Sequence, residues 1–375
     1  MIIKPSTQAE MCQQFFDACR LPRITRTEDN FENIDTDHPS NIIEVKSEDG
    51  RVALFILPKV ISKWPSFYAS KQKEASDKNL FFHCISGTHA LRFNATVDLL
   101  RRGKQVVSTG VAGIGKSAEL NAYLMEFLSN IGKSGWPREV WYRVDSKLFK
   151  FYLFNGNTVV EEEEKEATLS NLSSLTDKYS DSSIEVQPVL FLELTEDEIN
   201  PISYISTLIQ LSNHNVYDTT KEFEKAGATY MLVNPPTCAD LCHMACFEAR
   251  FGFNSVFAKK SKEEVTALVT ERVNIVGPIP RLVFQNEDRF QASVADLSDN
   301  VSKIFDAIKR MSVTCSPEVA SNYIAAFVDD ESAVPFIAGG LRVPFSLRFL
   351  SDHIALLVAR ACTKEVKRQV LDRTE

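Results

Sequence analysis

The stretch VVSTGVAGIGKSAEL, residues 106–120, constrains the fold more than any other part of the sequence. It satisfies the pattern G-x-x-x-x-G-K-[ST] through Gly110, Gly115, Lys116 and Ser117. The preceding KQVVS predicts a strand, and SAELNAYLMEFLSNIG predicts a helix whose apolar face carries Leu120, Leu124, Phe127 and Leu128. Glycines let such a loop turn successive backbone N–H groups inward, and the helix N-terminus adds a partial positive charge. This context favours a phosphate-binding loop over a plain glycine-rich turn.

The residues of this loop would together hold ATP and Mg²⁺. Lys116 would reach the β and γ phosphates, and the hydroxyl of Ser117 would ligate the metal. The nucleotide would also contact the other loop residues, namely Gly110, Val111, Ala112, Gly113, Ile114, Gly115 and Ala118.

Hydrolysis at such a site needs an acid at the end of a neighbouring strand, which holds the metal or polarises the attacking water. Glu193 ends the apolar run VLFLEL and is predicted to take this part, with a solvated strand-end acid as the alternative. Glu196 and Asp197 lie close by in the sequence. Asn234 ends ATYMLVN, where its amide would sense the γ phosphate or orient water, or would merely follow the strand.

The pattern of apolar residues divides the chain into three regions. From residue 81 to about 290, short apolar runs alternate with longer amphipathic segments, which predicts an α/β domain with a mainly parallel sheet. Residues 1–80 are predicted to form a small α+β region, with a helix at 7–19 and a hairpin of NIIEVK and RVALFILP joined through SEDG. The acidic run EEEEKEA and the Ser-rich segment after it are predicted to form an exposed insertion. Residues 291–375 are predicted to form a helical module, with helices at about 298–311, 317–328 and 346–371.

Charge and hydropathy exclude several classes of partner. The formal net charge is −8, so nucleic acid is not the default partner, although a local basic patch would permit it. No apolar run reaches 18 residues, which argues against a membrane span, and the start MIIKPSTQAEMCQQFF lacks the layout of a secretory signal. The eight cysteines lack the dense spacing of a disulfide-stapled fold and are expected to be reduced thiols. We therefore expect an intracellular chain.

Several motifs together resemble a known family. Their order and spacing, in VVSTGVAGIGKSAELNAYLMEFL, EVWYRVDSKLFKFYLFNGNTVVE, VLFLEL, TYMLVNPPTCADL and EEVTALVTERVNIVGPIPRLVF, are similar to the P-loop NTPase module shared by Crinkler effectors and trypanosomatid retrotransposon hot spot proteins. The resemblance spans about residues 85–290. It implies an ATPase of the additional-strand, AAA-like class, often joined to a nuclease-like domain in proteins that act in a nucleus.

The residues of the resemblance can be named one by one. The phosphate loop of the module is matched by Gly110, Gly113, Gly115, Lys116 and Ser117. Arg281 matches the arginine of the family's G-x-P-R element. Ala112 stands where the family often has proline, and Glu193 stands where aspartate is commoner.

Arg281 follows a stiff turn, because Gly277, Pro278 and Pro280 come directly after the amphipathic helix predicted at about 262–274. A guanidinium at this junction would touch the γ phosphate and report its presence to the C-terminal helices. The alternative is a helix-capping arginine or an ion pair with Glu271 or Asp288.

Two other groups of residues carry weaker signals. Glu44 and Lys46 in NIIEVK fit a metal-dependent nuclease, with Asp35 or Asp37 as a second carboxylate, but an exposed strand with alternating charges gives the same letters. In CADLCHMAC, a helix would align Cys238, Cys242 and Cys246 on one stripe beside His243, which favours buried thiols over a zinc site.

Two functions follow from these residues. The first is an ATPase whose hydrolysis moves the helical module against the sheet. The second is a catalytically weak, nucleotide-gated module, in which ATP only fixes the conformation that a protein or nucleic-acid partner recognises. Either function needs the nucleotide as ligand.

Overall fold

The computed structural model describes residues 8–28, 41–58, 81–85, 88–111, 113–144, 147–163, 167–177, 187–194, 205–211, 227–251, 254–303, 325–329 and 345–371. Within these ranges, no helix is both long enough and apolar enough to cross a membrane.

A helix and a small sheet form the N-terminal part. The helix α1 (Gln8–Arg20) was predicted, and the sheet has the order β1-β2-β3-β4. The expected hairpin is confirmed, because β2 pairs antiparallel with β3 on either side of SEDG. β4 pairs with β3, so the sheet extends past residue 80. The strands are β1 (Ile24–Thr27), β2 (Ile43–Lys46), β3 (Val52–Ile56) and β4 (Phe81–Ile85).

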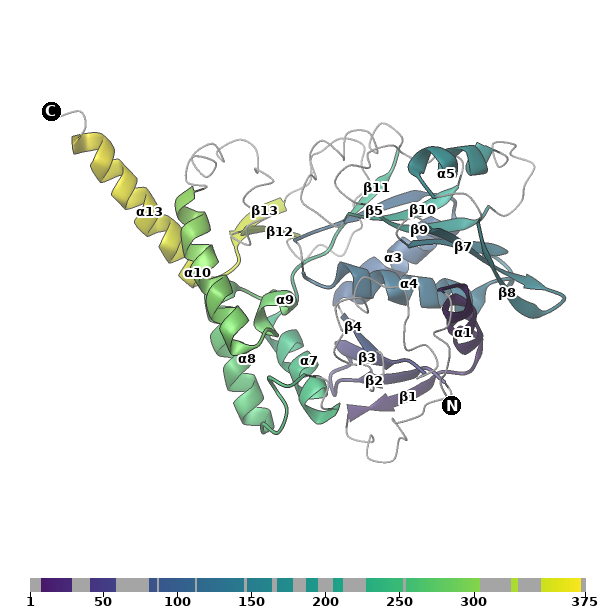
Figure 1. Ribbon diagram of the computed structural model, residues 1–375, viewed down its shortest axis with the longest axis horizontal. Helices are drawn as coiled ribbons and strands as arrows, with labels where there is room; N and C mark the ends of the chain where they lie inside the picture. The colour runs from purple at the N-terminus through teal and green to yellow at the C-terminus, as the bar shows by residue number, and fades with distance from the viewer. Residues whose placement is uncertain are drawn as a thin grey trace.

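A seven-stranded sheet lies above this one in Figure 1, with the order β11-β5-β10-β9-β6-β7-β8. The pairs from β11 to β6 are parallel, which confirms the predicted α/β architecture with a mainly parallel sheet. β7 and β8 extend it antiparallel at one edge. The strands are β5 (Gln105–Thr109), β6 (Glu139–Val144), β7 (Lys147–Phe154), β8 (Asn157–Glu162), β9 (Val189–Leu194), β10 (Ser206–Leu211) and β11 (Thr229–Leu232).

Part of the predicted insertion is instead regular structure. Glu161 and Glu162 belong to β8, where Lys147 pairs with Glu162 at 2.6 Å across the strands. The Ser-rich segment after the acidic run contributes α5 (Leu169–Thr176). The prediction was wrong here because Lys147 and Lys150 of β7 pair with Glu162 and Glu163, so these carboxylates need no exposed loop.

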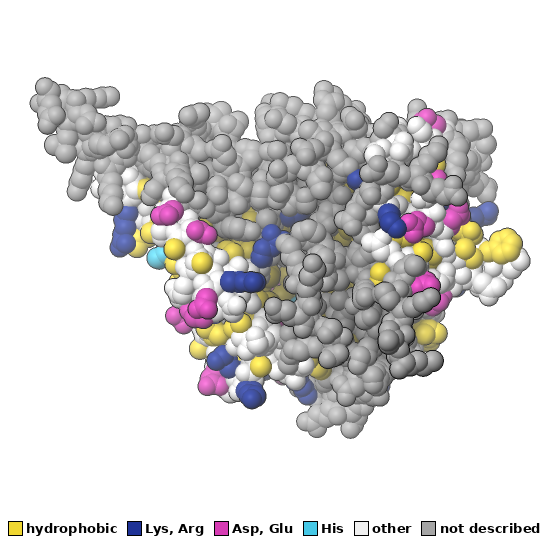
Figure 2. All heavy atoms as spheres, in the orientation of Figure 1, with side chains coloured by type: hydrophobic (Ala, Val, Ile, Leu, Met, Phe, Trp, Pro, Cys, Tyr) yellow, Lys and Arg dark blue, Asp and Glu magenta, His cyan; other side chains and the backbone are white. Residues whose placement is uncertain are grey.

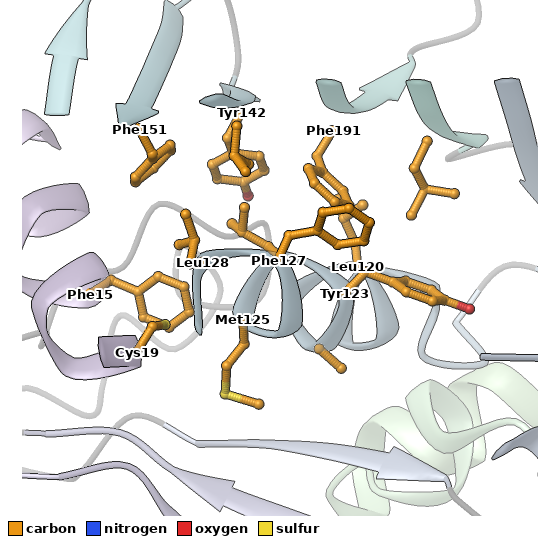
Figure 3. Close-up of a cluster of buried hydrophobic side chains, with 14 of the residues drawn as sticks. Phe15, Cys19, Leu120, Tyr123, Met125, Phe127, Leu128, Tyr142, Phe151 and Phe191 are labelled. Carbon is orange, nitrogen blue, oxygen red and sulfur yellow. The ribbon is translucent and has the colours of Figure 1, made fainter. Parts of the chain in front are cut away.

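The helix after the glycine-rich loop, α4 (Lys116–Asn130), lies between the two sheets (Figure 1). Figure 3 shows Phe127 and Leu128 directed toward Tyr142, Phe151 and Phe191 of the large sheet, while Met125 points the other way. The predicted apolar face is confirmed, since its four members are at most 4% exposed. α3 (Thr88–Arg101) packs beside α4, where Phe93 stacks on Tyr123 with ring centroids 4.4 Å apart. Because side chains on opposite faces of α4 are buried, the helix and its first residue have a fixed place between the two sheets.

Helices dominate the C-terminal part. α8 (Lys262–Val276) begins with the reciprocal cap of Ser261 and Glu264, and its C-cap is Gly277, whose φ is +81°. A Cβ there would lie 2.6 Å from the carbonyl oxygen of Leu350, so only glycine fits this close approach to the segment before α13. The helices are α7 (Cys238–Phe251), α8 (Lys262–Val276), α9 (Pro280–Val283), α10 (Glu287–Lys303) and α13 (Asp352–Leu371).

The helical module also contains two strands, which corrects part of the prediction. The helix expected at 346–371 is confirmed over Asp352–Leu371, but its first residues belong to a strand, as do residues 325–328 of the helix expected at 317–328. β12 (Ala325–Asp329) pairs antiparallel with β13 (Phe345–Phe349), and α13 starts only at Asp352. FSLRF alternates apolar and polar residues, which is typical of a strand, and the prediction of a helix did not take this pattern into account. The remainder of the helix expected at 317–328 lies outside the described residues.

Candidate functional site

The glycine-rich loop has a backbone that only glycine adopts readily. Gly110, Gly113 and Gly115 have φ angles of +154°, +77° and +104°. A Cβ at Gly110 would lie 2.6 Å from the carbonyl oxygen of Val233, whereas one at Gly115 would meet no atom within 4 Å. The loop is therefore tight against the end of β11 on one side and open beside the start of α4. Ala112 lies outside the described residues.

Two apolar residues anchor the loop from beneath. Val111 and Ile114 are 4% and 3% exposed and pack in one cluster with Leu241 of α7 and Leu282 of α9. Their side chains belong to the core, although Ile114 also lines the cavity beside the loop.

Lys116 begins α4 beneath this loop. Its Nζ atom donates to the carbonyl oxygens of Gly110 and Val111, each at 3.0 Å, and the residue is 7% exposed. The N-cap residue of α4 is Gly115, and no side chain caps the helix. A buried ammonium and the helix N-terminus thus combine at one end of α4, as an anion site requires. Ser117, the predicted metal ligand, lies in the same first turn.

Glu193 lies at the same sheet edge as the loop. In the strand register, Glu193 pairs with Gln210 of β10, and Gln210 pairs with Ser108 of β5. Glu193 is therefore level with Ser108, which lies two positions before Gly110 in the sequence. The backbones of Glu193 and Ser108 are two strands apart, roughly 10 Å at the usual strand spacing. Its side chain lies outside the described atoms, as do Glu196 and Asp197.

α9 rests directly on the loop. The backbone N–H of Arg281 donates to the carbonyl oxygen of Gly113 at 3.3 Å, and a Cβ on Gly113 would lie 2.7 Å from the Cβ of Arg281. The side chain of Arg281 is exposed and forms no ion pair with a described residue, so the alternative pairs with Glu271 and Asp288 are not formed. The structure brings the backbone of Arg281 to the glycine-rich loop, and the predicted contact of its guanidinium with a γ phosphate stays a prediction.

A second arginine, which the sequence analysis missed, holds α9 in place. Arg272 of α8 is 2% exposed and donates to the carbonyl oxygens of Val283, at 2.8 Å, and Gln285. It also pairs with Glu287 of α10 at 2.8 Å and lies over the ring of Phe290. Its signal in the sequence is a charged residue in the apolar stripe of Val265, Val269 and Val276.

A cavity opens beside the loop and the start of α4. Apolar walls come from β4, α7 and α9, through Ile85, Met244, Pro280 and Phe284. Polar walls come from His83, Arg92, Glu119 and Asn234. The predicted Asn234 therefore lies close to the loop, although its strand, β11, flanks β5 on the side away from Glu193.

Two polar pairs that the sequence analysis did not select lie at this cavity, which Arg92, Glu119 and His83 line. Arg92 of α3 and Glu119 of α4 form an ion pair at 2.6 Å. His83 Nδ1 lies 3.9 Å from Glu248 Oε1, and both side chains are at most 8% exposed. Burial lowers the pKa of His83 to about 3 and raises that of Glu248 to about 7. No local motif marks these residues, because the sheet and α7 bring them together only in the fold.

The alternative sites gain little from the geometry. Lys46 pairs with Glu44 of its own strand at 3.6 Å, while Asp35 and Asp37 lie outside the described residues. The thiols of Cys238, Cys242 and Cys246 lie half-buried on α7. In the described part of the chain, no group of three His, Cys, Asp or Glu side chains could hold a metal ion.

The described charged side chains visible in Figure 2 form no broad basic patch. Over α7, α8 and α10 in Figure 2, the described acidic, basic and hydrophobic side chains are interspersed.

Comparison with known proteins gives only distant similarities. No protein-family model and no curated protein matches the chain. A solved structure of the S. cerevisiae Hsp104-ADP complex is similar at 12% identity and a TM-score of 0.32, covering 59% of this chain and 33% of that one. Domain III of the Thermotoga maritima replication initiation protein DnaA is similar at 10% identity and a TM-score of 0.28, covering 62% of this chain and 90% of that one. The chain thus spans about a third of the Hsp104 chain that it matches, and scores this low carry no functional conclusion.

Proposed function

We propose that the chain is a P-loop NTPase that binds ATP with Mg²⁺ at residues 110–118 and hydrolyses it. The observation that carries the proposal is the loop itself: three glycines with positive φ lead into an uncapped helix whose first residue is Lys116. A triphosphate there would draw on Lys116, the helix N-terminus and the loop N–H groups together.

The strand order supports the additional-strand type of this fold. In that type one strand separates the loop strand from the strand with the catalytic acid. β10 lies in that place, between β5 and β9. Glu193 would then hold Mg²⁺ with Ser117 or polarise the attacking water, and the exposed guanidinium of Arg281 would meet the γ phosphate.

The cavity would take the rest of the nucleotide. Its lining includes Gly115 of the loop and the apolar residues Met244, Pro280 and Phe284, which would suit a flat base. Phosphates on the loop and a base in this cavity would place the nucleotide between α4 and α9.

The second function, a nucleotide-gated binding module, is favoured by the contact between Arg281 and Gly113, because this contact would connect bound nucleotide to α9 without any need for hydrolysis. Relation to the Crinkler and retrotransposon hot spot module, and a nuclear protein or nucleic-acid partner, rest on the sequence motifs alone.

Titration calorimetry with ATP and Mg²⁺ tests the binding proposal. Lys116→Ala should weaken ATP binding at least tenfold, while Lys133→Ala, an exposed residue beyond the C-terminus of α4, should leave it unchanged. Equal affinity of the wild type and Lys116→Ala, at matched folding, would overturn the phosphate site. Phosphate release then separates the two functions: turnover that Glu193→Gln lowers about a hundredfold supports the ATPase, and binding without turnover supports the gated module.

A further inference from the structure

Glu119 offers a fixed hydrogen-bond acceptor to the cavity. It lies in the first turn of α4 and its side chain is 12% exposed. Its Oε1 atom accepts from Arg92 Nη2 at 2.6 Å and from the hydroxyl of Tyr123 at 3.3 Å. Its Oε2 atom has no hydrogen bond to a described residue and does not belong to the fully buried polar atoms. One oxygen of this carboxylate is therefore held and the other is available to a ligand.

The neighbours of Glu119 keep this arrangement rigid. Arg92 comes from α3 and is 15% exposed, and the ring of Tyr123 stacks on Phe93. Burial raises the pKa of Tyr123 well above its ordinary value, so its hydroxyl stays protonated and continues to donate. Arg92 also neutralises the carboxylate, which would otherwise repel a triphosphate on the adjacent loop. The carboxylate can thus lie near bound phosphates without opposing them.

The place of Glu119 along α4 corresponds to the sugar of a bound nucleotide. It follows Lys116 by three residues, about 4.5 Å along the helix axis. The phosphates would lie at the N-terminal end of α4, and the base would lie toward Pro280 and Phe284. The sugar connects these two parts, and its hydroxyl groups are the donors that a free carboxylate oxygen accepts. Acidic side chains bind ribose hydroxyls in this way in dinucleotide-binding folds.

We propose that Glu119 Oε2 accepts a hydrogen bond from a ribose hydroxyl, so that the site prefers ribonucleoside triphosphates to their deoxy analogues. Arg92 and Tyr123 are positioning residues that hold the carboxylate. This inference rests on the proposed function, since it takes the phosphates to lie on the loop.

The test compares ATP, 2′-deoxy-ATP and 3′-deoxy-ATP by titration calorimetry with unlabelled nucleotides, because common fluorescent labels occupy the ribose itself. The wild type should bind ATP about tenfold to a hundredfold more tightly than at least one deoxy analogue, the effect of one hydrogen bond to a charged group. Glu119→Gln keeps an oxygen for Arg92 and Tyr123 and removes the charge, so the preference should fall. Combined Glu119→Met and Arg92→Met removes the ion pair as a unit, and the preference should disappear.

Glu126→Gln is the matched control, because Glu126 lies two turns further along α4, pairs with Arg23 and does not line the cavity. It should keep the wild-type preference. Equal binding of all three nucleotides by the wild type would overturn the inference and leave the phosphate site standing. An unchanged preference in the double variant would overturn it as well, and failure of every nucleotide to bind would overturn both proposals.

Discussion

The backbone N–H of Arg281 donates a hydrogen bond to the carbonyl oxygen of Gly113, 3.3 Å away. This bond joins the glycine-rich loop to α9 without any ligand. The guanidinium of Arg272 continues this connection. It donates to the carbonyl oxygens of Val283, which ends α9, and Gln285, and it pairs with Glu287 in the first turn of α10. A shift of the loop on nucleotide binding would therefore be passed to α9 through the backbone of Arg281 and to α8 and α10 through the guanidinium of Arg272, whatever the side chain of Arg281 does.

A pair of glycine variants tests this connection. Gly113 and Gly115 both have positive φ, so alanine strains the backbone at either position by about 1 kcal/mol or more. Only at Gly113 would the added Cβ collide with Arg281. We expect Gly113→Ala to speed limited proteolysis around residues 280–290 far more than Gly115→Ala does. Equal cleavage of the two variants would show that α9 does not depend on its contact with the loop.

Arg281→Ala tests the side chain separately. Because the guanidinium is exposed and unpaired among the described residues, its loss should change the free energy of unfolding by less than about 0.5 kcal/mol. ATP binding should weaken by about 1.5 to 3 kcal/mol and ADP binding should not change, if the guanidinium meets only the γ phosphate. Calorimetric titrations with both nucleotides measure this difference. Parallel loss of ATP and ADP affinity would place the arginine elsewhere on the nucleotide, and no loss would make it structural.

Arg272 should contribute to the stability of the fold as well as to the connection between the glycine-rich loop and α10. Arg272→Met leaves two backbone carbonyls and Glu287 without their donor, which should lower the free energy of unfolding by about 2 to 4 kcal/mol. Arg272→Lys keeps the charge but not the fork of donors, so an intermediate loss is expected. Urea denaturation measures both. Arg289→Met, at an exposed position of α10, is the control, and equal stability of the Arg272 and Arg289 variants would contradict this role.

The sequence predicted the parts of the site that are local. A strand, a glycine-rich loop and an amphipathic helix are contiguous in residues 105–130, and each has its own pattern of residues. The turn that aims Arg281 is equally local, since its prolines and glycine stand next to it. The sequence analysis did not select STLIQL, which forms β10, and the place of this strand between β5 and β9 is set by pairing with distant segments.

The side chains that complete the cavity could not be predicted, because their partners are remote in sequence. Arg92 and Glu119 are 27 residues apart and meet only when α3 packs beside α4. His83 and Glu248 come from a strand of the small sheet and from α7. By contrast, Arg272 interrupts an apolar stripe, and such an interruption can be recognised before the fold is known.

The buried carboxyl of Glu248 should make stability depend on pH. Burial raises its pKa from 4.5 to about 7, with an opposing hydrogen bond from Asn254. Because the folded pKa lies above the unfolded one, the stability that Glu248 contributes is fully present below pH 4.5 and is lost as the pH rises through about 7. Glu248→Gln has the same shape and does not titrate. The stability of the variant relative to the wild type should therefore increase between pH 5 and pH 8, by up to about 3 kcal/mol.

The neighbouring imidazole does not obscure this comparison. The pKa of His83 is lowered to about 3, so its contribution is present above pH 6.5 and is lost as the pH falls toward 3. That change has the opposite direction, but His83 is present in both proteins and largely cancels in their difference. Urea denaturation at intervals of half a pH unit measures the difference, with Glu271→Gln on the exposed side of α8 as control. A constant difference between Glu248→Gln and the wild type from pH 5 to pH 8 would show that the carboxyl ionises in the folded protein as it does in the unfolded chain.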